Sequence, residues 1–198
     1  MRAARLAVRR RWTRLAIIAL VAIGVWQVGS GAYIHAKAWL AQQLIASAWT
    51  RTLAGEREVK PWPWADTWPV GRLKVIDRDV DLYVLADASG RSLAFGPGYL
   101  SGTGTIGEGN AVIAGHRDTH FAFLRDLHPG DELTIQTVDG GEWTFQLNET
   151  HVIDSRHEGL QFDDAAATVT LLTCYPFNAI VPGGPLRYVA VAGVKSSS

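Results

Sequence analysis

One cysteine, Cys174, is the residue of this chain best suited to nucleophilic chemistry. It closes the apolar run of residues 168–173 and is followed by Tyr175 and Pro176. Because proline cannot donate to a sheet ladder, the chain has to turn directly after the cysteine. A thiol at the tip of a rigid strand is well held and accessible, as a nucleophile must be. The alternative is a small buried hydrophobe, which is a common fate of free cysteine.

Two further residues could complete a site around this thiol. A free thiol is mostly protonated at neutral pH and needs a base or a cation beside it. His116 follows the apolar run of residues 110–114 through Gly115, which permits a close backbone approach. Since adjacent strands lie about 4.8 Å apart, the tips that carry His116 and Cys174 can face one groove. Arg187 opens the last apolar run, and pairing of that run with the preceding one would bring its guanidinium towards Cys174, where it could donate to a substrate carbonyl or oxyanion.

Two other patterns suggest different chemistry but lack the structural context for it. The stretch Gly102-Thr103-Gly104-Thr105-Ile106-Gly107 matches G-x-G-x-x-G, but the dinucleotide-binding version opens a helix. Here another apolar run, residues 110–114, follows, so we interpret the glycines as a loop. His116 and His120 would face one metal ion only on a helix. The Asp-Thr pair between them makes a helix doubtful, and we expect no metal site.

The elements that must position these residues have the pattern of strands. Eight short runs are rich in β-branched, aromatic and leucine side chains and are separated by Gly, Pro, Asp and Asn. Asp139-Gly140 lies between two of them and is a hairpin signal. No long helix is predicted between the runs, so the fold class is all-β, an antiparallel sandwich or barrel. The predicted strands are residues 72–76, 81–85, 92–95, 110–114, 132–138, 142–154, 168–174 and 186–194.

The N-terminal part of the chain has a different composition. The first 51 residues carry eight basic residues and no acidic one, whereas the remainder carries 11 basic and 19 acidic residues, which argues against nucleic-acid binding by the folded part. Six arginines precede an uncharged apolar run of twenty residues, 15–34, which as a helix spans a hydrocarbon core of about 30 Å. The arginines place the N-terminal side in the cytoplasm. The alternative is a cleavable signal peptide with a site at Ala36-Lys37-Ala38, although this run exceeds the roughly 7–15 apolar residues of such a peptide.

These features divide the chain into four segments. They are a cytoplasmic basic segment (1–14), a transmembrane signal anchor (15–34), a stalk helix with a Pro/Trp-rich linker (35–69) and a β-domain (70–198) on the outer side of the membrane. Gly55 is a plausible stop for the stalk helix, and three prolines exclude a helix after it. The tryptophans of the linker could lie at the membrane interface or pack on the domain.

Taken in this order and at these spacings, the motifs resemble those of the sortase family. Thr170-Leu171-Leu172-Thr173-Cys174 looks like the sortase TLxTC signature. Gly115-His116-Arg117-Asp118-Thr119 is similar to the segment around the sortase catalytic histidine, and Arg187 matches the sortase arginine. The resemblance covers about residues 70–195 and also takes in residues 95–99, Gly107, Asn110, Ala114 and Pro129-Gly130-Asp131.

This resemblance implies a closed eight-stranded antiparallel or mixed β-barrel with short helices and a cysteine transpeptidase activity. Cys174 would attack the Thr–Gly carbonyl of an LPxTG-like signal at the C-terminus of a secreted protein and form a thioester, from which an amine on the cell surface would take the acyl group. His116 would protonate the leaving amine and deprotonate the incoming one. Arg187 would orient the substrate and stabilise the oxyanion. Four neighbouring residues would bind the substrate: Thr173, Leu172, Tyr175 and Gly115.

Three finer expectations accompany the resemblance. The stretch Cys174-Tyr175-Pro176-Phe177-Asn178, continuing to Pro182-Gly183-Gly184-Pro185, looks most like the Gram-negative branch of sortases, which implies an inner-membrane protein with a periplasmic catalytic domain. His120 stands where many relatives have an aromatic residue. Some sortases use calcium, and the loop of residues 155–167 contains Glu158, Asp163 and Asp164, but a solvated acidic loop is the simpler interpretation and we expect no cofactor.

Two other classes of function share these features. A membrane-anchored β-domain could bind a partner with Cys174 buried and unreactive. A membrane-anchored cysteine hydrolase could use the same site but transfer the acyl group to water. Labelling of the folded protein by a small alkylating reagent would distinguish the first from an enzyme, and product analysis with and without an added amine would distinguish the second.

Overall fold

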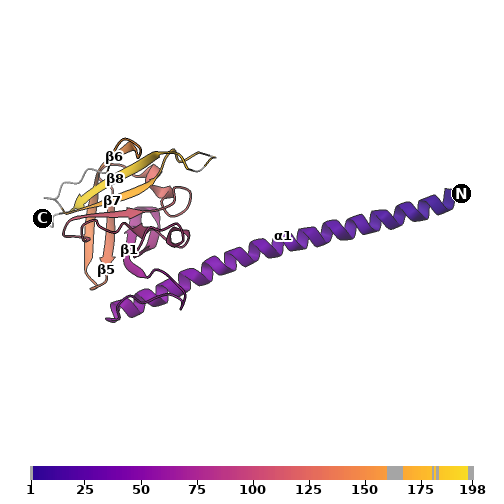
Figure 1. Cartoon of the computed structure of the whole chain (residues 1–198), viewed down its shortest axis with the longest axis horizontal. Coiled ribbons are helices and arrows are strands. Elements are labelled where there is room, and N and C mark those ends of the chain that lie inside the picture. The colour runs from indigo at the N-terminus through magenta and orange to yellow at the C-terminus, as the bar shows by residue number, and fades with distance from the viewer. Residues whose placement is uncertain (1, 160–166, 180, 182, 196–198) are drawn as a thin grey trace. The chain divides into compact units, whose positions relative to one another are not determined.

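The computed structural model describes residues 2–159, 167–179, 181 and 183–195. Within these residues a long helix precedes eight strands and three short 3₁₀ helices (Figure 1). In chain order the elements are α1 (Arg2–Leu53), β1 (Pro69–Val75), η1 (Ile76–Arg78), β2 (Val80–Leu85), η2 (Ser92–Ala94), β3 (Gly98–Tyr99), β4 (Asn110–Ala114), η3 (Ala122–Asp126), β5 (Glu132–Thr137), β6 (Glu142–Asp154), β7 (Thr168–Cys174) and β8 (Leu186–Val194).

The strands close into one barrel in the order β1-β2-β3-β4-β7-β8-β6-β5. Most neighbours are antiparallel, but β2 pairs with β3 and β4 pairs with β7 in parallel, so the barrel is mixed. Side chains alternate between the two faces of a strand, and one set from each strand fills the interior. Leu73, Ile113, Phe145 and Leu171 are fully buried there. The closed eight-stranded barrel is therefore confirmed, and the sandwich is excluded.

The strand predictions are most accurate in the second half of the barrel. β4, β6, β7 and β8 have the predicted bounds, and β1, β2 and β5 differ from the prediction by one to three residues at an end. The Asp139-Gly140 pair lies in the turn that joins the antiparallel strands β5 and β6. Gly140 has a φ of 83° there, a conformation that glycine adopts without strain. The predicted hairpin is confirmed.

The prediction of a strand at residues 92–95 is wrong. The segment forms η2, and the strand of this region is the two-residue β3. The Asp87 carboxylate accepts hydrogen bonds from the Ser89 N–H at 2.8 Å and from the Ser92 hydroxyl at 2.7 Å. The Ser92 N–H in turn donates to the Ser89 hydroxyl at 3.3 Å, so a side chain takes a backbone group that a ladder would otherwise use. Although burial raises it, the hydrogen bonds to its carboxylate lower the pKa of Asp87 to about 2.

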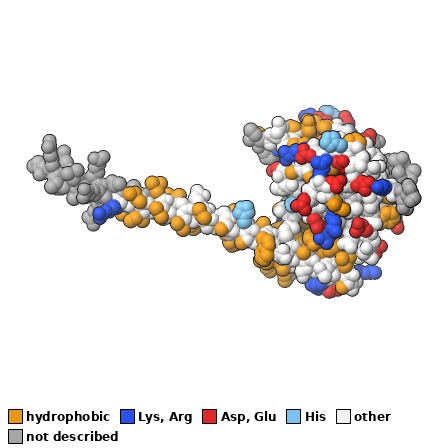
Figure 2. Space-filling model, turned by 180° about the vertical axis from the view of Figure 1, so that it is seen from behind, with side chains coloured by type: hydrophobic (Ala, Val, Ile, Leu, Met, Phe, Trp, Pro, Cys, Tyr) orange, Lys and Arg blue, Asp and Glu red, His pale blue; other side chains and the backbone are white. Residues whose placement is uncertain are grey.

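α1 joins the predicted span and the predicted stalk in one unbroken helix. It ends at Leu53, two residues before Gly55, whose φ is 98°. Its part from residue 17 onwards is long and apolar enough to cross a membrane, by length and composition. Apolar side chains such as Val25 and Trp26 are exposed, and Figure 2 shows apolar side chains along the helix. Lipid is the solvent that suits an exposed helix that is apolar all round.

The chain forms two compact units that divide between Gln42 and Gln43. The second unit therefore contains the last turns of α1 and the linker as well as the barrel. Within this unit, Ile45 and Trp49 of the helix are buried. The Trp49 ring lies 6.4 Å from the ring of Tyr83 in β2, so the helix end packs on the barrel.

Part of the Pro/Trp-rich linker also packs on the barrel unit. The Trp62 ring meets the Phe95 ring edge-on at 5.0 Å, and the Trp68 carbonyl accepts a hydrogen bond from the Ala86 N–H at 2.9 Å. Trp64, in contrast, is 80% exposed. Of the two interpretations of the linker tryptophans, packing on the domain is correct for Trp62.

Candidate active site

Cys174 is the last residue of β7 and lies on the outer face of the barrel. Val169 and Leu171 of the same strand belong to the buried core. The alternation of side chains along a strand therefore turns Cys174 outwards. Cys174 is partly exposed as a residue, which argues against the alternative of a buried hydrophobe.

Arg187 is the residue directly opposite Cys174. β7 and β8 are antiparallel, and their register pairs Cys174 with Arg187. Residues directly opposite each other in such a pair have Cα atoms about 4.5–5.5 Å apart and side chains on the same face. The pairing expected from the sequence is observed, and it places the side chains of Cys174 and Arg187 on the same face of the sheet.

His116 follows β4, the other neighbour of β7. β4 and β7 run parallel with Asn110 opposite Thr168 and Ala114 opposite Leu172. The same offset, continued two residues beyond the strand end, brings His116 level with Cys174. The three predicted residues thus lie at one end of three neighbouring strands, β4, β7 and β8.

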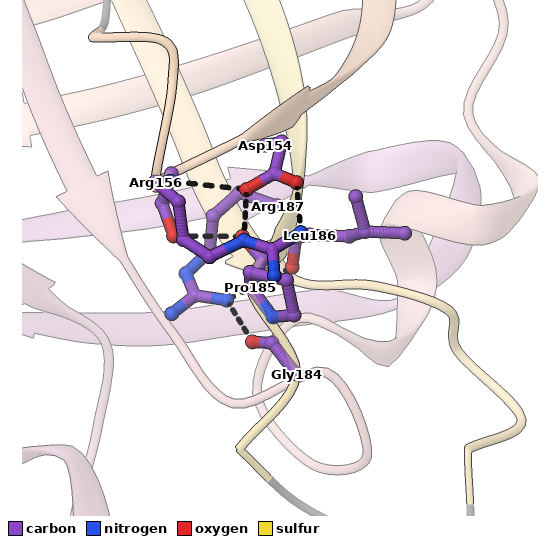
Figure 3. Close-up of polar contacts among 7 residues, drawn as sticks. Asp154, Arg156, Gly184, Pro185, Leu186 and Arg187 are labelled. Carbon is purple, nitrogen blue, oxygen red and sulfur yellow. Dashed lines mark hydrogen bonds and ion pairs between the residues drawn. The ribbon is translucent and has the colours of Figure 1, made fainter.

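The Arg187 guanidinium is held by backbone oxygens rather than by a carboxylate. Its Nη1 donates hydrogen bonds to the Gly184 carbonyl at 2.6 Å and to the Leu186 carbonyl at 2.9 Å (Figure 3). The nearby carboxylate of Asp154 is taken by Arg156 at 2.6 Å, and these hydrogen bonds hold the pKa of Asp154 well below its usual range. Among the described residues Arg187 forms no ion pair, so its charge is available to a bound group.

The two histidines of this region differ in their surroundings. His116 is exposed, whereas His120 is partly buried. Burial, followed by the positive charge of His116, lowers the pKa of His120, and Asp118 opposes this shift. Residues 117–120 form turns rather than a helix. Within the part of the chain that the structure describes, no group of three or more His, Cys, Asp and Glu side chains could hold a metal ion.

The four predicted substrate-binding residues surround these side chains in different ways. Leu172 is partly buried and lies on the same face as Cys174, two residues earlier in β7. Thr173 is buried, and its hydroxyl donates to the Gly115 carbonyl at 2.6 Å. A Cβ on Gly115 would lie 2.7 Å from the ring of Phe121, so glycine is required for this packing. Tyr175 is partly buried and stacks on another tyrosine ring.

An aromatic cluster of Tyr175, Phe177 and Tyr188 lies next to the candidate site. The three rings contact one another with centroids 5.1–6.2 Å apart. The guanidinium of Arg125 lies 5.8 Å from the centre of the Phe177 ring. A second arginine, Arg117, donates from Nη2 to the Ala179 carbonyl at 2.8 Å. Neither arginine is indicated by a sequence pattern, and the one available signal is that Arg117 directly follows His116.

The glycine-rich stretch before β4 has a packing role. A Cβ on Gly107 would lie 2.2 Å from the Trp143 ring, and one on Gly104 would lie 2.5 Å from the Asn110 nitrogen. A strand follows the stretch, as predicted, and a dinucleotide-binding helix does not. Of the residues considered for calcium, Glu158 is exposed, and Asp163 and Asp164 lie outside the described residues. Pro182, from the stretch after Cys174, also lies outside them.

Comparisons with known proteins agree on one family. A family model described as a sortase domain matches residues 73–195. Sortase D of Bacillus subtilis (strain 168) is 33% identical over 82 residues, which are 41% of this chain and 40% of that protein. The match therefore spans less than half of the curated relative.

Solved structures of sortases share the barrel. Sortase A from Corynebacterium diphtheriae has a TM-score of 0.60 and 22% identity, with 68% of this chain and 64% of that chain covered. Clostridium perfringens sortase C with the C-terminal cell wall sorting motif has a TM-score of 0.59 and 19% identity, with 81% and 90% covered. These relatives give no support to the Gram-negative branch. The family model covers more than half of the length of this chain, and the chain therefore belongs to the sortase family of cysteine transpeptidases.

Proposed function

We propose that this protein is a membrane-anchored transpeptidase that cuts an LPxTG-like sorting signal between Thr and Gly and joins the freed carboxyl end to an amine on the cell surface. One observation carries the proposal: Cys174 lies directly opposite Arg187, and His116 follows two residues after Ala114, whose partner Leu172 lies two residues before Cys174. A nucleophile, an acid/base and a donor for an oxyanion are the three groups that acyl transfer requires.

In the proposed reaction, the Cys174 thiolate attacks the threonine carbonyl carbon, and a C–S bond forms. The C–N bond to glycine then breaks, and His116 gives its proton to the leaving amine. An acceptor amine attacks the resulting thioester and loses a proton to His116 as the amide forms and the thiolate is released. Each proton given by the imidazole is thus returned in the second half of the cycle.

Arg187 acts in this scheme on the oxyanion of each tetrahedral intermediate. Its Nη1 is held by the Gly184 and Leu186 carbonyls, so the plane of the guanidinium is fixed before substrate arrives. Its charge has no carboxylate partner among the described residues. Donors that are oriented in advance lose little free energy in reorganising when the negative charge develops.

Two comparisons support the substrate class. The family model identifies a sortase domain, and a similar fold has been solved as a sortase C with the C-terminal cell wall sorting motif. We propose that Leu172 and Tyr175, beside the thiol, contact the bound peptide, and that Gly115 and Thr173 shape the same groove. The Gram-negative branch rests on the pattern of residues 174–185 alone, and we do not include it in the proposal.

The proposal includes a single membrane crossing through residues 15–34, with residues 1–14 in the cytoplasm and the barrel outside. Support comes from the six arginines before the span and from a helix that is apolar enough to cross. Protease added to intact spheroplasts should digest the barrel. Protection of the barrel until the cells are lysed would contradict this orientation.

The central experiment incubates the full-length protein in detergent with a library of sorting-signal peptides, with and without an added amine. A transpeptidase gives a peptide–amine conjugate at the expense of the hydrolysis product, whereas a hydrolase gives the same acid in both cases. We propose that no cofactor takes part, so a metal chelator should leave the rate unchanged. Absence of any Cys174-dependent cleavage would contradict the proposed function.

A further inference from the structure

The backbone on the N-terminal side of His116 is tied to β7. The Gly115 N–H donates to the Leu172 carbonyl at 3.0 Å, and the Gly115 carbonyl accepts from the Thr173 hydroxyl at 2.6 Å. Both polar groups of the residue before His116 are therefore used to attach it to the strand that ends at Cys174. This anchor fixes where the chain leaves β4.

A second anchor lies on the C-terminal side of His116. Arg117 is partly buried, and its Nη2 donates to the Ala179 carbonyl at 2.8 Å. Ala179 is in the connection between β7 and β8, five residues after Cys174. Both sequence neighbours of His116 thus contact the segment that carries the thiol, one before it and one after it.

The His116 side chain has no hydrogen-bonding partner of its own within the described residues. It is exposed, and its backbone carbonyl accepts from the Phe121 N–H at 2.9 Å, which closes the turn. The place of the imidazole is therefore set by the backbone on either side of it. Loss of either anchor would let the imidazole move relative to the thiol.

The Arg117 contact holds the middle of the β7–β8 connection. Nearer to Cys174 the connection is held by Phe177, which lies under Arg125, and at its far end Gly184 is held by Arg187. Ala179 lies between these points. A hydrogen bond from a guanidinium is charge-assisted and stronger than one between neutral groups, so Arg117 is suited to fix this part of the connection.

We propose that Arg117 is a positioning residue that holds His116 at its working distance from Cys174, an inference that rests on the proposed function. Its guanidinium joins the turn that carries the imidazole to the connection that follows the thiol. Arg117 does not touch the reacting atoms in this proposal. It acts by holding the turn that follows β4 against the connection that follows β7.

Steady-state kinetics of the full-length protein test this role. Arg117→Met keeps the aliphatic stem and removes the donors, while Arg117→Lys keeps a charged donor. Because a misplacement of about 1 Å can cost about 10²-fold in rate, Arg117→Met should lower kcat by about 10- to 100-fold with little change in KM. Arg117→Lys should recover much of the loss, and Arg91→Met, which removes an exposed arginine paired with Asp66, should match wild type.

A melting curve for each variant ensures that rates are compared where all the proteins are folded. A loss confined to KM would show that Arg117 shapes the peptide groove, which overturns the proposal. Equal losses in Arg117→Met and Arg117→Lys with unchanged melting would overturn it as well, because a donor to the Ala179 carbonyl would then not matter.

A second experiment needs no substrate. Cys174 is the chain's one cysteine, so His116→Cys creates a single possible disulfide, which requires Cα atoms about 4.4–6.8 Å apart. With oxidised glutathione, His116→Cys should form this crosslink about tenfold faster than His116→Cys/Arg117→Met, if Arg117 holds the two positions together. Equal rates in the two backgrounds would refute the positioning role. Should the wild-type protein cleave no sorting peptide, the proposed function fails, and the crosslinking rates still decide the role of Arg117.

Discussion

Replacing Arg187 by lysine separates the geometry of this residue from its charge. A guanidinium has five N–H donors in a fixed plane, and lysine has three on one atom. Nη1 uses its two N–H groups on the Gly184 and Leu186 carbonyls. The Nε and Nη2 donors remain for a bound carbonyl or oxyanion, since no hydrogen bond from them is found among the described residues.

A lysine ammonium cannot serve both purposes. If the lysine Nζ takes the place of Nη1 at the two carbonyls, only one of its protons remains. That proton does not lie where the Nε and Nη2 donors of arginine would be. If the ammonium turns to the substrate, Gly184 loses its donor. Removal of one oxyanion donor costs about 10²–10³ in kcat, so we expect Arg187→Lys to lose about a hundredfold, or about 2.7 kcal/mol of transition-state stabilisation.

The assay pairs peptide turnover with the rate at which a small reagent alkylates Cys174 in the same preparation. Since lysine keeps a positive charge at the position opposite Cys174, the alkylation rate should stay near that of wild type. A parallel fall of both rates would show that Arg187 acts on the ionisation of the thiol. An unchanged turnover would show that Arg187 is an ordinary surface residue, and the site would then consist of Cys174 and His116.

Four further outcomes follow from described contacts. Cys174→Ala should fold normally and show no turnover, and activity above background would exclude a thioester. His116→Ala should lose at least about 10²–10⁴ in rate while His120→Ala loses little; equal losses, with inhibition by a chelator, would indicate a metal pair instead. Because the pKa of His120 is lowered in the folded protein, the unfolded chain binds more protons between that pKa and the ordinary value of about 6.5, so stability should fall as the pH drops through this window. His120→Gln should flatten this part of the denaturant-derived stability curve, and an unchanged slope would refute the assignment. Gly115→Ala should cost about 1–3 kcal/mol because its Cβ would lie 2.7 Å from a buried phenylalanine ring, whereas Gly90→Ala, where nothing lies within 4 Å, should be close to neutral in the same titration.

Strands with a strong local pattern could be predicted from the sequence. β4, β6, β7 and β8 alternate or run apolar between clear turn residues, and their predicted bounds are those observed. The segment at residues 92–95 also has apolar residues but contains η2, because the Ser89 hydroxyl, and not a neighbouring strand, accepts the hydrogen bond of the Ser92 N–H. Local composition does not reveal such a competition. It depends on which polar side chain reaches the segment from outside.

The candidate site could be predicted in part for a similar reason. Cys174 and Arg187 are close in sequence, and two successive strands commonly pair, so their proximity was predictable. The parallel pairing of β4 with β7 joins segments almost sixty residues apart, and no local pattern specifies it. Arg117 was not predicted because a lone arginine in a turn has no periodicity. Only the folded chain shows that its side chain reaches Ala179.

The strand order of the barrel also bears on when the site can assemble. β7 and β8 are the last strands to be made, and they fill the gap between β4 and β6. Until they arrive, β4 and β6 present unpaired edges on which other chains could add. The thiol and the guanidinium enter with the strands that close these edges, so barrel closure and site assembly are one event during folding. A chain truncated before β7 would therefore lack the nucleophile and keep two unpaired strand edges, which would make it prone to aggregate.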